Sequence, residues 1–329
     1  MRTKSEYSFR CSINGPTLVT GGTGMIGGEI ARLLLERGDV VRVMVRARGA
    51  ASEALEELGA KIVIGDVTDV DSVFTAVDGC ASIYHCAGLV NPFQWNIDDY
   101  DRVNVAGTGN VLDAALSTGT KQFLHVSSIA ALGARPGSLA DETTQVRDAW
   151  KRGYGRSKFG SEELVRSVAG QMHAVIVNPA VVFGRNDRHF VRLINVFLKG
   201  RLPAIAFKNR PLPLVYLSDV ARGSLLAMER GKTGKRYILA QPTVTVGEFF
   251  LELARSSGRR PPRINLPDWI VVTGAMAWSV VSALRRRPSP IEFLKHGAAD
   301  YDGGMVTQEL GLTYTPFREA IQAVLSDMK

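Results

Sequence analysis

A tyrosine and a lysine four residues apart carry the clearest chemistry in this sequence. Tyr154 and Lys158 lie in a segment with a helical pattern, so the phenol and the ammonium share one helix face. A phenol with a pKa of about 10 is a poor acid or base at neutral pH, and a neighbouring ammonium lowers that pKa. Upstream, Ser127 and Ser128 end an apolar run, where a hydroxyl can hydrogen-bond a substrate carbonyl. Together these residue types predict a proton-transfer site.

A glycine-rich turn predicts a dinucleotide-binding site. Gly21, Gly24 and Gly27 follow the short apolar run 17–20 and open the helical stretch 25–37. Glycines allow a tight turn and a close approach of the backbone to a pyrophosphate, and the free N–H groups of a helix start favour that anion. We expect the following residues to contact the cofactor: Gly21, Thr23, Gly24, Met25, Ile26 and Gly27.

The residues after the second and third apolar runs predict which cofactor binds. Arg46, with Arg48 nearby, stands where a carboxylate usually holds a free ribose 2′-hydroxyl. A guanidinium pairs instead with a 2′-phosphate. After the third run, Asp66 and Val67 can border the adenine, with the carboxylate near its amino group. The sequence therefore favours NADP(H), and NAD(H) is the alternative if Arg46 is only solvated.

The elements that position these residues alternate between short apolar runs and helical patterns. The predicted strands are 17–20, 39–45, 61–64, 81–85, 122–127 and 174–177, and the predicted helices are 25–37, 51–58, 70–77, 98–117 and 154–168. This alternation predicts an α/β fold with a doubly wound parallel (Rossmann) sheet over residues 16–180, after a flexible lead-in of residues 1–15. Beyond it, frequent prolines predict a smaller C-terminal substrate-capping part over 181–329, with about 211–240 returning to the Rossmann domain.

Several short motifs, in order along the chain, resemble those of the extended short-chain dehydrogenases/reductases. The matching segments are TGGTGMIGG (20–28), GDV (65–67), HCAG (85–88), NVAGT (104–108), VSS (126–128), YGRSK (154–158), NPAVVFG (178–184) and VYLSDVA (215–221). Within this family, the end of the second run and the SSIAALG stretch (127–133) resemble dihydroflavonol reductase and 3β-hydroxysteroid dehydrogenase-like members. The resemblance implies the same doubly wound fold and an NAD(P)-dependent oxidoreductase.

This resemblance also implies a role for each residue of the reaction centre. Tyr154 would be the general acid/base, and Lys158 would also hold the nicotinamide ribose. Asn104 would support a proton relay, and Ser128, rather than Ser127, would be the catalytic hydroxyl. Four further residues would border the cofactor: Cys86, Ala87, Pro179 and Val182, with Pro179 beside the nicotinamide.

Three functions remain open. The first is NADPH-dependent reduction of a ketone or aldehyde on a bulky, largely apolar substrate, because the segment 266–284 offers aromatic and aliphatic residues and few groups suited to a diphosphate. The second is a nucleotide-sugar epimerase with tightly bound NAD, and the third is a dinucleotide-sensing protein without turnover. Dehydration is disfavoured, because Ile129 and Ala130 stand where dehydratases of the family carry an acidic pair.

Composition narrows the cofactors and partners. Lys and Arg number 40 against 32 Asp and Glu, a net charge of +8, but the basic residues are dispersed and do not predict a nucleic-acid interface. The 5 histidines lack metal-ligand spacing, so no metal site is predicted. The 3 cysteines and the absence of an apolar leader favour a cytoplasmic protein. We expect a small-molecule substrate, and either a monomer or a homodimer.

Two apolar segments have two interpretations each. The stretch 269–287, which ends in Arg285–Arg287, is too short to span a bilayer. It is either a helix over the substrate pocket or a peripheral membrane contact with its arginines near lipid headgroups. Phe93 and Trp95, in the loop after the fourth strand, either line an apolar pocket or form an ordinary surface loop.

Overall fold

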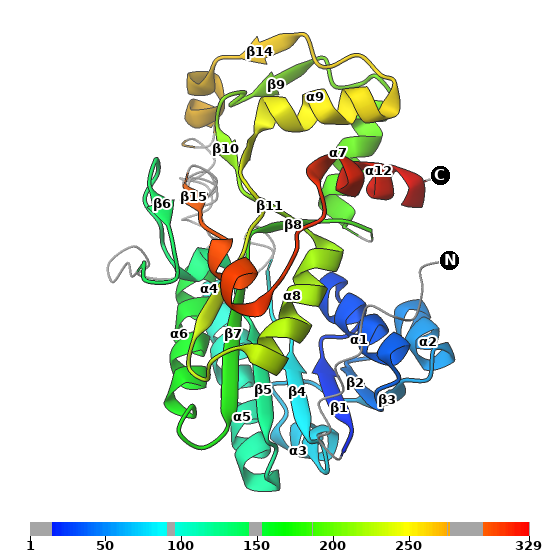
Figure 1. Cartoon of the computed structure of the whole chain (residues 1–329), viewed down its shortest axis with the longest axis vertical. Coiled ribbons are helices and arrows are strands. Elements are labelled where there is room, and N and C mark those ends of the chain that lie inside the picture. Colours follow the sequence, from blue (N-terminus) through cyan, green and yellow to red (C-terminus); the bar gives the residue numbers. More distant parts are fainter. Residues whose placement is uncertain are drawn as a thin grey trace.

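Seven parallel strands form the central sheet of the molecule (Figure 1). The computed structural model describes residues 15–90, 96–144, 153–185, 187–274, 276 and 299–328. The strands are β1 (Thr17–Thr20), β2 (Val41–Val45), β3 (Lys61–Ile64), β4 (Ser82–His85), β5 (Gln122–Val126), β7 (His173–Pro179) and β12 (Arg236–Leu239). Their order across the sheet is β12-β7-β5-β4-β1-β2-β3, and every neighbouring pair is parallel. The predicted doubly wound parallel sheet is confirmed.

Helices cover both faces of this sheet. On one face lie α1 (Met25–Arg37) and α8 (Leu217–Arg230), and on the other lie α3 (Val70–Val77), α5 (Gly107–Thr118) and α6 (Tyr154–Ser167). The short helix α2 (Ala50–Glu57) packs beside α1. Each covered face has its own core of buried side chains, because both sides of the strands are removed from water.

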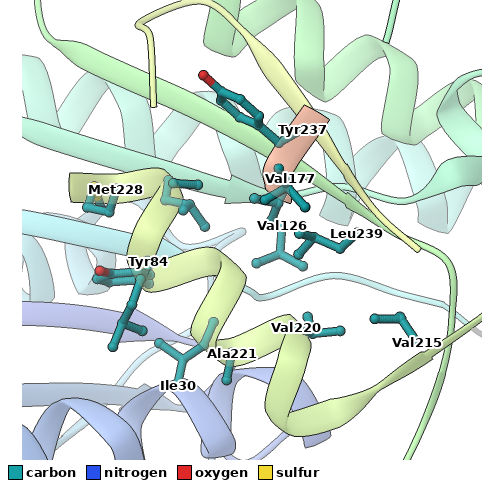
Figure 2. Close-up of a cluster of buried hydrophobic side chains, with 14 of the residues drawn as sticks. Ile30, Tyr84, Val126, Val177, Val215, Val220, Ala221, Met228, Tyr237 and Leu239 are labelled. Atoms are coloured by element: carbon teal, nitrogen blue, oxygen red, sulfur yellow. The ribbon is translucent and has the colours of Figure 1, made fainter. Parts of the chain in front are cut away.

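The strand side chains alternate between the two cores with period two. On β1, Leu18 belongs to the core under α3 and α5, whereas Val19 belongs to the core under α1 and α8. Figure 2 shows the second of these cores, where Ile30 of α1 and Ala221 of α8 meet Tyr84 of β4. Short strands that are apolar on both faces therefore suffice to anchor a helix layer on each side.

The segment predicted as one helix over 98–117 is divided in the structure. It consists of α4 (Ile97–Tyr100), a π-helical segment η1 (Asp101–Ala106) and α5. The backbone remains helical throughout, because Tyr100, Ala106 and Gly107 all keep right-handed helical dihedral angles. A π-helical turn carries one residue more than an α-helical turn, and such turns are common at functional sites. The sequence pattern, which follows a period of 3.6, gave no sign of this change.

The part of the chain after β7 builds small sheets and a third core. The paired strands are β8 (Val181–Phe183) with β11 (Leu214–Tyr216), β9 (Ala204–Ala206) with β14 (Ile264–Leu266), β10 (Pro211–Leu212) with β13 (Val244–Thr245), and β6 (Leu139–Ala140) with β15 (Asp300–Tyr301). Three helices, α7 (Arg188–Leu198), α9 (Val246–Ser257) and α12 (Phe317–Asp327), enclose a core rich in phenylalanine. Between β11 and β13 the chain returns to the central sheet, where it forms α8 and β12.

Two sequence hypotheses fall largely outside the described residues. Phe93 and Trp95 lie there, as do residues 1–14 and most of 269–287. Of the latter stretch, Trp269, Ile270 and Met276 are described and are 66%, 43% and 54% exposed. Within the described part of the chain, we find no helix with the length and apolar character needed to cross a bilayer.

Two glycines of α5 give opposite predictions for stability. A Cβ on Gly107 would lie 2.7 Å from Cγ2 of the buried Val67, whereas one on Gly109 would lie 3.8 Å from Leu164, an ordinary contact. We expect Gly107→Ala to lower the free energy of unfolding by about 1–3 kcal/mol through overpacking. Gly109→Ala is expected to raise it by about 0.5–1 kcal/mol through helix propensity. Urea unfolding of both variants measures the difference, and equal effects would contradict the close packing of α5 on Val67.

Candidate active site

The turn between β1 and α1 has the shape that a pyrophosphate requires. Gly21 has a positive φ of 67°, and a Cβ there would lie 2.8 Å from the backbone N of Ala87. A Cβ on Gly27 would lie 2.5 Å from the Gly21 carbonyl oxygen. The first turn of α1 has neither an acidic residue nor a side chain that caps it, so its N–H groups can donate to an anion. These residues fit a dinucleotide. Thr23 and Gly24 lie in the same turn, and Met25 and Ile26 begin α1.

A chain of buried hydrogen bonds supports this turn from below. The hydroxyl of Thr20 accepts from the Ala87 N–H (3.2 Å) and contacts Nδ1 of His85 (2.8 Å). Nε2 of His85 contacts the Thr108 hydroxyl (3.0 Å), which donates to the Asn104 carbonyl (2.6 Å). Burial lowers the pKa of His85 to about 3, so the imidazole is neutral and can both donate and accept. This connection is not visible in the sequence, because Thr20, His85 and Thr108 come from three separate segments.

The two arginines after β2 differ in their partners. Arg48 forms an ion pair with Glu56 of α2 (2.5 Å) in which both side chains are about half exposed. Arg46 is exposed and forms no ion pair with any residue of the described ranges. After β3, burial acts to raise the pKa of Asp66, but hydrogen bonds from the backbone and hydroxyl of Thr68, aided by the charge of Arg46, hold it below its usual value. The sequence grouped Arg46 and Arg48 together, and the structure separates them.

Ser128, Tyr154 and Lys158 come together where β5 ends against α6. Tyr154 is the first residue of α6, and its phenol hydrogen-bonds with the Ser128 hydroxyl. Lys158, one turn further along, is 4% exposed and donates from Nζ to the Val126 carbonyl oxygen (3.0 Å), two residues before Ser128. The helix period and the strand end thus bring together the three residues that the sequence predicted.

The pKa of Tyr154 differs from the expectation. Burial raises it to about 12, although the hydrogen bond with Ser128 acts to lower it. Burial also lowers the pKa of Lys158 to about 8, against the attraction of Cys86 and Glu162. The expectation that Lys158 lowers the pKa of Tyr154 is therefore wrong for this structure, because Nζ is bound to the Val126 carbonyl and burial dominates the phenol. Tyr154 is a neutral phenol, the form that can donate a proton.

Asn104 lies in the π-helical segment with its side chain fully engaged. Its Oδ1 accepts from the Leu89 N–H (2.7 Å), and its Nδ2 donates to the Leu89 carbonyl (3.1 Å) and to the Ser157 hydroxyl (2.9 Å). A Cβ on Gly88 would lie 3.1 Å from that Oδ1 and 3.2 Å from Nζ of Lys158. Asn104 therefore holds the loop after β4 beside Lys158, and a side chain at position 88 would require Asn104 or Lys158 to shift by a few tenths of an ångström.

All but one of the remaining predicted cofactor residues lie at the ends of strands of the central sheet. Cys86 and Ala87 follow β4, and burial raises the pKa of the Cys86 thiol to about 12. Val67 follows β3 and is buried under Gly107. Pro179 ends β7, and Val182 lies in β8, partly buried. Val67, Cys86, Ala87 and Pro179 lie at or beyond the carboxyl ends of strands of the central sheet, where ligands bind in open parallel sheets, whereas Val182 lies within β8.

Comparison with known proteins agrees with this geometry. The model of the NAD dependent epimerase/dehydratase family matches residues 17–240, from β1 through β12. The chain belongs to this family. It is an NAD(P)-dependent oxidoreductase of the extended short-chain dehydrogenase/reductase type and acts on a small molecule.

Relatives within this epimerase/dehydratase family cover most of the chain. A Synechocystis protein described as a candidate dihydroflavonol 4-reductase is 34% identical over 92% of this chain and 91% of its own. A ketoreductase from Stigmatella aurantiaca that acts on a farnesylated dihydroquinoline oxide is 30% identical, over 76% of each chain. Among solved structures, gox2253 is 31% identical with a TM-score of 0.82, over 95% of this chain and 97% of its own. A UDP-glucuronic acid 4-epimerase from Bacillus cereus, solved with NAD, shares the fold at 18% identity, with a TM-score of 0.76 over 95% and 96%.

Proposed function

We propose that the protein is an NADPH-dependent reductase of a ketone or aldehyde group on a bulky, largely apolar substrate. The observation that carries the proposal is the neutral, partly buried Tyr154 phenol beside the Ser128 hydroxyl. A carbonyl oxygen held by these two hydroxyls can receive a proton as it gains electrons, which is the requirement of a reduction. Lys158, held by the Val126 carbonyl, fixes the helix turn that carries Tyr154.

Each part of the site has a task in this proposal. The N–H groups at the start of α1 bind the pyrophosphate, and Arg46 binds the ribose 2′-phosphate. When bound, the nicotinamide supplies the hydride that adds to the carbonyl carbon. Ser128 donates a hydrogen bond that orients the substrate oxygen, and Tyr154 transfers its proton to that oxygen. The products are an alcohol and a phenolate, and the phenolate regains a proton from solvent.

One observation argues against dehydration, and the named relatives support an apolar substrate. Ile129 and Ala130, directly after Ser128, are buried apolar residues, so no carboxylate stands where a dehydratase would need one. Relatives named as ketoreductase and as 3-beta-hydroxysteroid dehydrogenase act on large, mostly apolar molecules. Trp269 and Ile270 are exposed. We therefore include a peripheral membrane contact of this segment in the proposal. A nucleotide-sugar epimerase with bound NAD is the alternative.

The substrate class has a direct test. Incubation with NADPH and a panel of apolar aryl or polycyclic ketones is expected to oxidise NADPH, followed as loss of absorbance. Nucleotide sugars are expected neither to bind tightly nor to be epimerised. Tight nucleotide-sugar binding, without turnover of any ketone, would replace this proposal by the epimerase alternative.

The acid role of Tyr154 predicts the effect of its removal. Tyr154→Phe is expected to lower kcat by about 10²–10⁴-fold, as is typical when a positioned acid–base group is lost. The Kd of NADPH is expected to stay near that of the wild type, because only a hydroxyl is removed. Stopped-flow turnover and fluorescence titration measure the two quantities, and wild-type turnover in this variant would rule out the mechanism.

Cofactor preference has a matched pair of variants. A charge-assisted hydrogen bond contributes about 1.5–3 kcal/mol, so we expect NADPH to bind about ten- to a hundredfold more tightly than NADH. Arg46→Asp is expected to reverse that order, since its carboxylate repels a phosphate and accepts from a ribose hydroxyl. Arg48→Asp is expected to keep the order, because Glu56 already engages Arg48. Added salt should narrow the gap, and equal wild-type affinities at low salt would leave Arg46 a solvated side chain.

A further inference from the structure

A buried carboxylate lies directly behind the reaction centre. Glu162 is 0% exposed and follows Tyr154 and Lys158 along α6 at intervals of four residues, so the three share one helix face. Its Oε1 accepts from the Ser127 hydroxyl (2.6 Å) and from the Asn178 amide (2.6 Å). Its Oε2 pairs with Arg166 (2.7 Å) and lies 3.5 Å from Arg236 of β12. Four donors therefore converge on one side chain, and they come from α6, β7, β12 and the segment that follows β5.

The same contacts reach the residue that carries the catalytic hydroxyl. The Asn178 amide donates to Glu162 and, at 2.9 Å, to the main-chain oxygen of Ser128. Ser127, the preceding residue, is held on its other side by the hydrogen bond of its N–H to the Val177 carbonyl (2.8 Å). The carboxylate thus holds Ser127 through its hydroxyl and, by way of Asn178, the main-chain carbonyl of Ser128. Rotation of the Asn178 side-chain amide by 180° would break both of these hydrogen bonds.

The charge of Glu162 also acts on Lys158. Burial lowers the pKa of Lys158, and the attraction of Glu162 opposes that shift. The other groups that face Lys158 are the Cys86 thiol, which also raises its pKa, and the rings of His85 and His125, which burial keeps neutral. The groups that face Glu162 itself are Arg166 on its own helix and Arg236 on β12.

We propose that Glu162 is a positioning residue of this active site, which fixes the Ser128 hydroxyl through Asn178 and Ser127. The inference rests on the proposed reductase function for its kinetic readout. It deepens that function, because it assigns to a side chain outside the Ser–Tyr–Lys set the geometry on which that set depends. A misplacement of about 1 Å at a reaction centre can cost about a hundredfold in rate.

The chain offers a matched control one residue away. Glu163 is on the same helix and pairs with the same Arg166 (2.5 Å), but its side chain is 56% exposed. Glu162→Gln and Glu163→Gln therefore remove the same charge beside the same arginine, and only the first removes it from the contacts with Ser127 and Asn178. A glutamine at 162 also turns an N–H group toward one of the donors that the carboxylate satisfied.

The test compares kcat, the Kd of NADPH and the pH dependence of kcat in these two variants and the wild type. Glu162→Gln is expected to lower kcat by about ten- to a hundredfold while the Kd of NADPH is unchanged. Because Lys158 loses an attracting charge, its pKa falls, and the alkaline limb of the kcat profile is expected to move to lower pH. Glu163→Gln is expected to match the wild type in all three. A Glu162→Gln variant with wild-type kcat and profile, or the same losses in both variants, would overturn the proposal.

Two further measurements keep the inference independent of folding and of substrate. If Glu162→Gln does not fold, Ser127→Ala removes one donor and leaves the charge, so kcat should fall while the alkaline limb stays in place; wild-type kcat there would overturn the proposal. If the wild type reduces no ketone, the reductase proposal fails, but NMR of ¹³C-labelled lysine still reports the pKa of Lys158. A lower value in Glu162→Gln alone supports the role of Glu162, and equal values in both variants refute it.

Discussion

The hydrogen bond from Lys158 to the Val126 carbonyl joins α6, which begins with Tyr154, to the end of β5, two residues before Ser128. Burial makes this contact costly for an ammonium, and it correspondingly lowers the pKa of Lys158 to about 8. The cost is offset by the fixed carbonyl and by the buried carboxylate of Glu162 on the next turn. With α6 held there, Tyr154 at its first turn lies beside Ser128. The position of Tyr154 beside Ser128 thus depends on the hydrogen bond between the buried Lys158 ammonium and the Val126 carbonyl.

The cofactor turn depends on a different constraint, namely backbone contact without side chains. Gly21 approaches Ala87 so closely that any Cβ would overlap the backbone after β4. The polar chain from Thr20 through His85 to Thr108 then links this turn to the helix layer on the other side of the sheet. Because a charged imidazole in that place would be expensive, His85 stays neutral and acts as a fixed bridge. Buried hydrogen bonds therefore connect the glycine turn to the π-helical segment that carries Asn104.

Local signals in the sequence were enough for much of this. The bounds of α1 were predicted to the residue, because a glycine turn marks its start and Gly38, in the left-handed conformation, marks its end. The spacing of Tyr154 and Lys158 gave the helix face. What local pattern cannot supply is burial. Burial raised the pKa of Tyr154, whereas the sequence had predicted a lower pKa. The fold also made Glu162 the partner of Ser127, 35 positions away. Likewise, only the folded chain distinguishes Arg46 from Arg48, because Glu56 comes from the following helix.

The separation of the cores bears on how such a site can change its substrate. The phenylalanine-rich core under α7, α9 and α12 shares no buried residue with the two cores of the central sheet. Substitutions that are far apart and share no partners contribute nearly additively to stability. Changes confined to this phenylalanine-rich core can therefore accumulate with little effect on the Lys158 contact or on the glycine turn after β1. One link between the two parts runs through β8 and β11, and β8 begins two residues after Pro179. A second link consists of the hydrogen bonds between Thr315 and the Asp219 carboxylate of α8, so the position of the C-terminal part is coupled to the central sheet at more than one point.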